Sequence, residues 1–200
     1  DNVESRGLGD VYKRQVMPKM LLKKGDALKK INNSEYVIED EITIGGQDHF
    51  YLEGQISLVI PDEDNKFTVW SSTQHPTEVQ HCVANVLGIS QAKVTSKVRR
   101  LGGGFGGKES QASIIAVITA LCSWYFGKPA KLRLTRHDYM LDTGKRHDFL
   151  SLYKVGFNPD GRIQVLEVNL LSRAGNVADL SGPVMTRACL LYTSPSPRDS

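Results

Sequence analysis

The chain has 200 residues, and its 24% charged and 40% hydrophobic content excludes a disordered or collagen-like protein. A net charge of +3 is too small for the basic surface of a nucleic-acid-binding protein. Its three cysteines form no CxxC pair, which argues against a disulfide framework or a metal cage within the chain. No apolar run predicts a membrane helix and no signal peptide is evident, so we expect a cytoplasmic protein.

The two ends of the chain are related through the genetic code. Residues 5–15 can be encoded by a DNA segment whose reverse complement, shifted by one base, translates as residues 189–198. Such an inverted pair is typical of a sequencing-library adapter read at both ends of an insert. We therefore expect residues 1–15 and 189–200 to be adapter-derived and residues 16–188 to be the native fragment; the alternative is a natural tail rich in Pro and Ser.

The first predicted elements are strands. Two β-rich runs, Val37–Ile44 and Phe50–Ile60, are separated by Gly45-Gly46 and predict paired strands, with a third strand at Phe67–Ser71. A helix is predicted from Pro76 to Gly88, because its apolar residues recur at positions i, i+4, i+7 and i+8. Those residues are Val79, Val83, Val86 and Leu87.

The second half continues the alternation of strands and helices. Val94–Leu101 predicts a strand, and Ser110–Tyr125 predicts a helix that we expect to be buried, because apolar residues cover more than half of its circumference. Three further strands are predicted at Lys131–Thr135, Phe149–Phe157 and Ile163–Leu171. The last two form a hairpin through the turn-prone residues 158–161. The sequence predicts a mixed α/β fold without a linker-like stretch.

A glycine-rich loop joins the strand and helix in the middle of the chain. Residues 101–109 contain five glycines and one phenylalanine. Such a loop brings bare backbone N–H groups to a helix N-terminus, where an anion or a metal oxo group can accept them. A tight turn that only lets helix and strand pack closely is the simplest alternative.

Two nucleotide-binding motifs also fit this loop in part. Gly102, Gly104 and Gly107 match the dinucleotide fingerprint GxGxxG, but the next strand lacks a ribose-binding acid at its tip, and Asp138 is the only nearby candidate. The loop also matches the start of the phosphate-binding motif GxxxxGK[ST], but Glu109 replaces the required hydroxyl and would repel phosphate. Both readings are therefore weak alternatives.

Five motifs occur together in the order GGQDHFYLE (45–53), SSTQHP (71–76), RRLGGGFGGKE (99–109), GKRHDF (144–149) and DLSGP (179–183). Taken together they closely resemble the molybdenum-cofactor domain of the xanthine dehydrogenase family. The resemblance covers nearly all of residues 16–188, which would be a fragment of the molybdopterin-binding domain. It is nearest to the bacterial form, in which this domain is a separate large subunit.

The resemblance assigns roles to five residues. Gln74 resembles the glutamine that hydrogen-bonds a molybdenum ligand, and Phe105 and Gly106 resemble the pair whose backbone amides approach the metal's oxo ligand. Glu109 resembles the glutamate that binds the purine, and Arg187 resembles the arginine that stabilises negative charge developing on it; aldehyde oxidases of the family lack this pair.

Three further polar residues, His49, Glu53 and His75, are interpreted as structural.

The implied activity is oxidation of hypoxanthine and xanthine to urate by a molybdenum-molybdopterin enzyme. Electrons would pass through iron–sulfur (2Fe-2S) clusters and FAD, on a partner subunit of a hetero-oligomer or on another domain, to NAD. In the family the general base lies C-terminal of Ala188, so the fragment contains no catalytic residue. An aldehyde oxidase-like molybdenum hydroxylase, or a non-catalytic dinucleotide-binding or structural domain, is the alternative.

Overall fold

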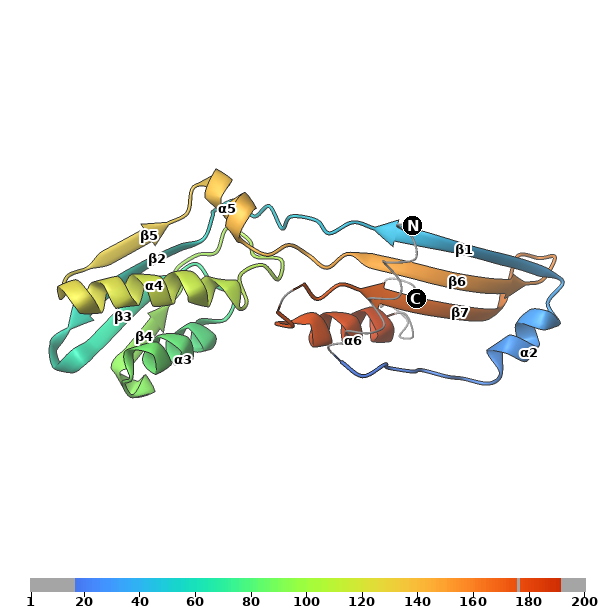
Figure 1. The fold of residues 1–200 in the computed structure, drawn as a ribbon, viewed down its shortest axis with the longest axis horizontal. Coiled ribbons are helices and arrows are strands. Elements are labelled where there is room, and N and C mark those ends of the chain that lie inside the picture. Colours follow the sequence, from blue (N-terminus) through green and yellow to red (C-terminus); the bar gives the residue numbers. More distant parts are fainter. Residues whose placement is uncertain (1–16, 176, 192–200) are drawn as a thin grey trace, which may run out of the picture. The chain divides into compact units, whose positions relative to one another are not determined.

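A computed structural model describes residues 17–175 and 177–191. The chain divides into two compact units (Figure 1), one formed by Gln47–Arg146 and the other by the residues before and after that segment. Both contain helices and strands, which confirms the predicted α/β class. Within these ranges no helix is long and apolar enough to cross a membrane.

The Gln47–Arg146 unit is a four-stranded sheet covered by two helices that pack against each other (Figure 1). Its elements are β2 (Ile56–Asp62), η1 (Glu63–Asn65), β3 (Lys66–Ser71), α3 (Pro76–Leu87), η2 (Gln91–Lys93), β4 (Val94–Lys97), α4 (Gln111–Phe126), β5 (Ala130–Arg133) and α5 (Arg136–Asp142). The strand order is β4-β3-β2-β5; β3 and β4 run parallel, and the other neighbouring pairs are antiparallel.

Helix α3 has the boundaries that its sequence predicts. Pro76 occupies the first turn, and Gly88 ends the helix in the left-handed conformation with φ of 64°. Val79 and Val83 are fully buried and contact Val59 and Val69 of the sheet in one apolar core. Burial of each such side chain stabilises the folded state by about 1.5–3 kcal/mol. This packing holds α3 against the sheet.

Helix α4 has the predicted extent but not the predicted burial. Its buried face consists mainly of small side chains: Ala112, Ser113, Ile115, Ala116, Thr119, Ala120 and Ser123. The expectation that the whole helix is buried is wrong for the described residues, because Ile114 is 61% exposed and Trp124 is 53% exposed. Small residues let the helix backbone approach the sheet closely, whereas most of the larger apolar side chains, among them Ile118, Tyr125 and Phe126, are exposed.

The second unit is built on a three-stranded antiparallel sheet in the order β1-β6-β7 (Figure 1). Its elements are α2 (Ala27–Asn32), β1 (Tyr36–Ile44), β6 (Phe149–Phe157), β7 (Ile163–Ser172) and α6 (Ser181–Leu191). The β6–β7 hairpin confirms the prediction from its turn, in which Gly161 has φ of 76°. Strand β1 pairs with β6 and not with the following run, so that predicted pairing is wrong.

Other departures from prediction concern element boundaries. Strand β2 begins at Ile56 because the preceding residues form an irregular segment around the buried Tyr51. Strand β4 ends at Lys97, and three helices, α2, α5 and α6, were not predicted. Helix α6 continues past Ala188 to Leu191, across the expected adapter boundary. Most of the two expected adapter segments, including Tyr12 and Tyr192, lies outside the described residues, so that boundary stays a prediction.

Candidate functional site

The glycine loop lies against the segment that follows strand β3. The backbone N–H of Gln74 donates to the carbonyl of Lys108 at 2.8 Å, and the Thr73 hydroxyl donates to the same carbonyl at 3.0 Å. At the other end of the loop, the N–H of Leu52 donates to the Gly102 carbonyl at 3.0 Å. The loop is therefore held between the residues that enter β2 and those that leave β3.

The side chain of Gln74 reaches into this loop. Its Oε1 accepts hydrogen bonds from the backbone N–H groups of Gly106 at 3.0 Å and Lys108 at 3.2 Å. A Cβ atom on Gly104 would overlap Oε1, so only glycine permits this approach. Within the described ranges, Nε2 of the exposed Gln74 has no hydrogen-bond partner. The amide is thus fastened by its acceptor and can donate to a ligand.

The tip of the loop presents backbone beside a single aromatic ring. Phe105 has φ of 51°, an uncommon conformation for a residue with a side chain, and is 62% exposed. Gly106 has φ of 90°, and a Cβ there would meet nothing within 4 Å. The structure therefore brings Gln74, Phe105 and Gly106 together. It differs from expectation in one respect: the N–H of Gly106 donates to Gln74, so a ligand would compete for it.

Glu109 and Arg187 carry the charges expected at the substrate. Glu109 follows the glycine loop and is half-buried, and Arg187 lies exposed on α6 of the other unit. Neither side chain makes a hydrogen bond or an ion pair with the residues that the structure describes. Both are thus available to a bound molecule.

Lys108 is a functional residue that the sequence did not predict, because there it stands out only as part of a phosphate-binding motif. Its side chain is fully buried, and Nζ donates to Ser72 Oγ at 2.5 Å and lies 3.3 Å from Glu53 Oε1. Burial lowers the pKa of Lys108, and the neighbouring Glu53 opposes this. Burial alone would raise the pKa of Glu53, but bonds from Ser72, the Gly102 N–H and Lys108 hold it below its ordinary value.

His49 fills space beneath the loop. A Cβ on Gly107 would lie 2.7 Å from the His49 ring, which stacks with Tyr51 at a centroid distance of 6.3 Å. Burial, and then the positive charge of Arg146, lower the pKa of His49 and favour the neutral ring. His75 begins α3, and its backbone N–H donates to Thr73 Oγ1 at 3.0 Å. These contacts support the interpretation of both histidines as structural.

Asp48, which precedes His49, forms a cluster with Tyr139 and Lys145. Tyr139, fully buried, donates its hydroxyl to Asp48 Oδ1 at 2.6 Å, and Lys145 Nζ lies 3.0 Å from Oδ2. Burial would raise the pKa of Asp48, but the bonds from Tyr139, Lys145 and the Phe50 N–H outweigh it and lower the pKa to about 2. The cluster thus stabilises the segment that leads into the site.

Replacing Tyr139 by phenylalanine is expected to lower the free energy of unfolding by about 1.5–3 kcal/mol at pH 7, because a hydrogen bond to a charged group is lost. Because folding lowers the pKa of Asp48, its carboxylate stabilises the fold at pH values above the ordinary pKa of 3.8. This contribution disappears as the pH falls toward about 2. The difference from the parent should therefore narrow in acid, as measured by urea unfolding. The exposed Tyr125→Phe is the control; a deficit independent of pH would contradict this account.

The structure contradicts both nucleotide-binding alternatives for the loop. A phosphate-binding lysine must reach its ligand, whereas Nζ of Lys108 is buried. A dinucleotide fold places consecutive parallel strands side by side, whereas β4 and β5 occupy opposite edges of this sheet. Asp138, the only candidate for a ribose contact, accepts bonds from the N–H and hydroxyl of Thr135, the N-cap residue of α5, and completes the capping box there.

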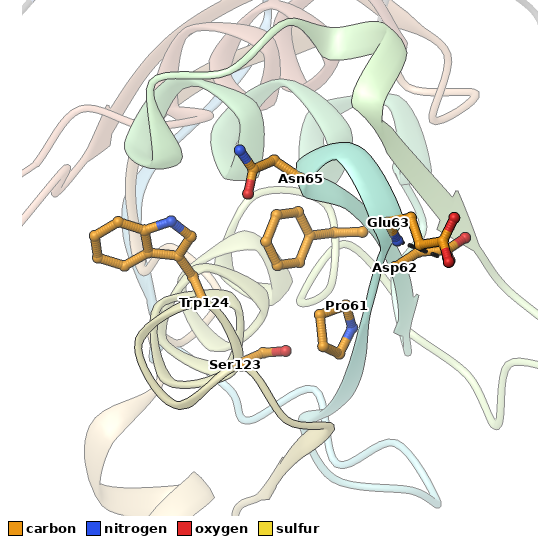
Figure 2. Close-up of a pocket in the computed structure, with 8 residues that line it drawn as sticks. Pro61, Asp62, Glu63, Asn65, Ser123 and Trp124 are labelled. Atoms are coloured by element: carbon orange, nitrogen blue, oxygen red, sulfur yellow. Dashed lines mark hydrogen bonds between the residues drawn. The ribbon is translucent and has the colours of Figure 1, made fainter.

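A pocket in the same unit lies away from the predicted residues. It is lined by Pro61, Asp62, Glu63, Asn65, Phe67, Ser123, Trp124 and Gly127, between the β2–β3 turn and the end of α4 (Figure 2). Gln74 follows the other end of β3. Figure 2 shows the Asp62 side chain occupied by its bond to the Glu63 N–H. The pocket therefore holds none of the predicted site residues.

A family model for the molybdopterin cofactor-binding domain matches residues 11–195. The chain belongs to the molybdopterin cofactor-binding domain family. The matched range extends beyond residues 16–188 on both sides, so the family assignment does not depend on the expected adapter boundaries. The site residues expected from the resemblance, Gln74 and the glycine loop, lie within the matched range.

Two relatives illustrate the match of this molybdopterin-binding domain. It is 45% identical over 168 residues to the xanthine dehydrogenase of Dictyostelium discoideum, covering 84% of this chain and 12% of that protein. It is 42% identical over 176 residues to the xanthine dehydrogenase/oxidase of Gallus gallus, covering 88% and 13%. The chain thus spans only 12–13% of these relatives, and the resemblance to the bacterial form stays a prediction.

Solved structures share the fold of the molybdopterin-binding domain. The aldehyde oxidoreductase from Desulfovibrio gigas superimposes with a TM-score of 0.65 at 21% identity, covering 75% of this chain and 16% of that chain. The CO dehydrogenase from Oligotropha carboxidovorans gives a TM-score of 0.62 at 23% identity, covering 72% and 18%. These similarities support the fold of the xanthine oxidase family.

The described residues fit a molybdopterin cofactor that is contacted through hydrogen bonds. Nε2 of Gln74 has no partner among them, and the backbone at Gly106 borders open space. No group of three His, Cys, Asp or Glu side chains within 17–175 and 177–191 could hold a metal ion. This part of the chain therefore offers hydrogen-bond donors to the ligands of a bound cofactor.

Proposed function

We propose that the chain forms one wall of the active site in a molybdenum hydroxylase that oxidises hypoxanthine and xanthine to urate. The arrangement of Gln74 supports this proposal most strongly. Its amide is fixed to the glycine loop through Oε1, while Nε2 has no partner among the described residues. A donor fixed in advance at an exposed loop stabilises an anionic ligand without having to reorganise.

The residues of this chain bind and orient the two reactants. Gln74 would hold the cofactor through a hydrogen bond to a molybdenum ligand, and Phe105 and Gly106 would line the same approach. Glu109 would accept from a purine N–H, and Arg187 would stabilise negative charge that develops on the ring. When bound, the molybdenum cofactor supplies the two-electron oxidation. The general base would come from another part of the full-length protein.

The electrons would leave through 2Fe-2S clusters and FAD to NAD. We place these groups on a partner subunit or on another domain, because this chain spans a small share of its relatives. Cys82, Cys122 and Cys189 are all unpaired, which supports a reducing, cytoplasmic setting.

The proposal is tested by producing the full-length protein that carries this segment in a host that makes the molybdenum cofactor. Bound molybdenum is measured by mass spectrometry, and urate formation from xanthine is followed with NAD as acceptor. We expect molybdenum and urate formation together. A metal-free protein, or a molybdenum enzyme that oxidises aldehydes but not xanthine, would refute the proposed function.

Replacing Gly104 by alanine tests the role of Gln74. The new methyl group would overlap Oε1 and displace a flexible, exposed side chain, so we expect a loss of stability below about 1 kcal/mol. Turnover of xanthine should fall about tenfold or more, because one preorganised donor is removed. Gly45→Ala is the matched control, since a Cβ there meets nothing within 4 Å. Parent-like turnover in Gly104→Ala would contradict the role of Gln74.

A further inference from the structure

Lys108 is the most deeply buried charged residue next to the site, and the proposed chemistry does not use it. Its side chain is 0% exposed. The ammonium group contacts Ser72 Oγ at 2.5 Å and Glu53 Oε1 at 3.3 Å, and it lies 4.3 Å from the centroid of the Tyr51 ring. A buried cation is tolerated only with such compensation, so these contacts are a requirement of the fold.

Glu53 connects this ammonium group to the beginning of the loop. The same oxygen, Oε1, accepts the backbone N–H of Gly102 at 2.9 Å and the hydroxyl of Ser72 at 2.5 Å. Gly102 is the first glycine of the loop, and Lys108 directly follows the last one. One carboxylate oxygen therefore joins both ends of the loop.

The backbone of Lys108 carries this constraint to Gln74. Its N–H donates to Gln74 Oε1 at 3.2 Å, and its carbonyl accepts the N–H of Gln74 at 2.8 Å. A displacement of Lys108 would thus move the Gln74 amide, whereas Nζ, enclosed in the protein, cannot reach a ligand.

We infer that Lys108 and Glu53 form a clasp that closes the glycine loop and sets the position of the Gln74 amide. Both are positioning residues, which act on the reaction through Gln74. This inference rests on the proposed function for its effect on turnover, but the clasp itself is a property of the fold. Ground-state binding of the purine is assigned to Glu109 and not to Gln74, so the clasp should affect kcat and leave KM nearly unchanged.

The test uses Lys108→Met, Glu53→Gln and the double variant in the full-length protein. Hydrogen exchange of the peptide spanning residues 101–109 reports on the loop, and kcat and KM for xanthine are corrected for molybdenum content. Lys131→Met is the matched control, because Lys131 is an exposed lysine on β5 of the same unit.

We expect Lys108→Met to accelerate loop exchange and to lower kcat, each by about tenfold, as for the loss of a hydrogen bond to a charged group, with KM within about twofold. The double variant should recover part of both losses, because Glu53 is no longer left without its cation. Glu53 is partly exposed, and glutamine has nearly the same shape as glutamate, so we expect Glu53→Gln to fold. This variant should accelerate loop exchange even if Lys108→Met does not fold.

Unchanged loop exchange in Glu53→Gln, or a rise in KM without a fall in kcat, would overturn the clasp. The two proposals fail in different ways. If the parent protein contains no molybdenum, the proposed function fails, while faster loop exchange in the variants still supports the clasp. If the parent is active and loop exchange is unaffected by both substitutions, the clasp alone fails.

Discussion

Replacing Arg187 by methionine in the full-length enzyme is expected to lower the turnover number for xanthine about a hundredfold, the equivalent of about 3 kcal/mol. Arg187 lies on α6 and makes no ion pair with the described residues, so its guanidinium is available to the substrate. If the guanidinium meets charge that develops on the purine only during the reaction, the lost energy belongs to the transition state. Steady-state kinetics should therefore show a fall in kcat with little change in KM.

The lysine variant separates charge from geometry. Arg187→Lys keeps the positive charge but not the planar fork of donors, so we expect partial recovery of turnover. Arg162→Met, an exposed arginine in the β6–β7 turn, is the control within the same unit. Turnover by Arg187→Met at the parent rate, after correction for molybdenum content, would remove Arg187 from the site and leave purine recognition to Glu109.

Replacing Glu109 by alanine is expected to lower the oxidation of xanthine far more than the oxidation of a simple aldehyde. For xanthine, kcat/KM should fall on the order of a hundredfold, because a charge-assisted hydrogen bond to the purine is lost. A simple aldehyde has no ring nitrogens to bind, so its oxidation should change by less than about threefold. Glu109 is half-buried and has no partner among the described residues, so its removal leaves no other group unpaired.

Competition between the two substrates in one reaction mixture measures this preference directly. Glu63→Ala provides the control, because Glu63 is exposed in η1 at the β2–β3 turn. Equal losses on xanthine and on the aldehyde would show that Glu109 supports the fold or the cofactor and not the purine.

The elements that could be predicted are those with local signals. Helix α3 carries its own start at Pro76 and its own end at Gly88, and the β6–β7 hairpin is specified by its turn. The partner of β1 could not be predicted, because Ile44 pairs with Phe149, far along the chain, and no turn between them specifies the pairing. The burial of α4 failed for a similar reason, since apolar content does not reveal which side of a helix contacts the sheet.

The motifs predicted the residues of the candidate site, but they did not predict the residues that hold the site in place. The resemblance named Gln74, Phe105 and Gly106, which the structure brings together. Lys108 was overlooked because a lysine after a glycine run is typical of phosphate binding, and only the fold shows that its ammonium group points inward to Glu53. The sequence signal that came nearest was Glu53, the acid at the end of the motif that precedes β2. Because Glu53 lies far from Lys108 in the sequence, nothing indicated that the two residues form a pair.

The pairing of Ile44 with Phe149 also has a consequence for synthesis on the ribosome. Strand β1 is made early, but its partner emerges only after the whole Gln47–Arg146 unit has been translated. That unit can complete its sheet first, since β2 to β5 pair only among themselves. Until β6 appears, the nascent chain carries a β-rich segment with unpaired backbone groups, which can pair with a strand other than β6. Shielding of residues 36–44 by a chaperone during translation would therefore raise the yield of folded protein.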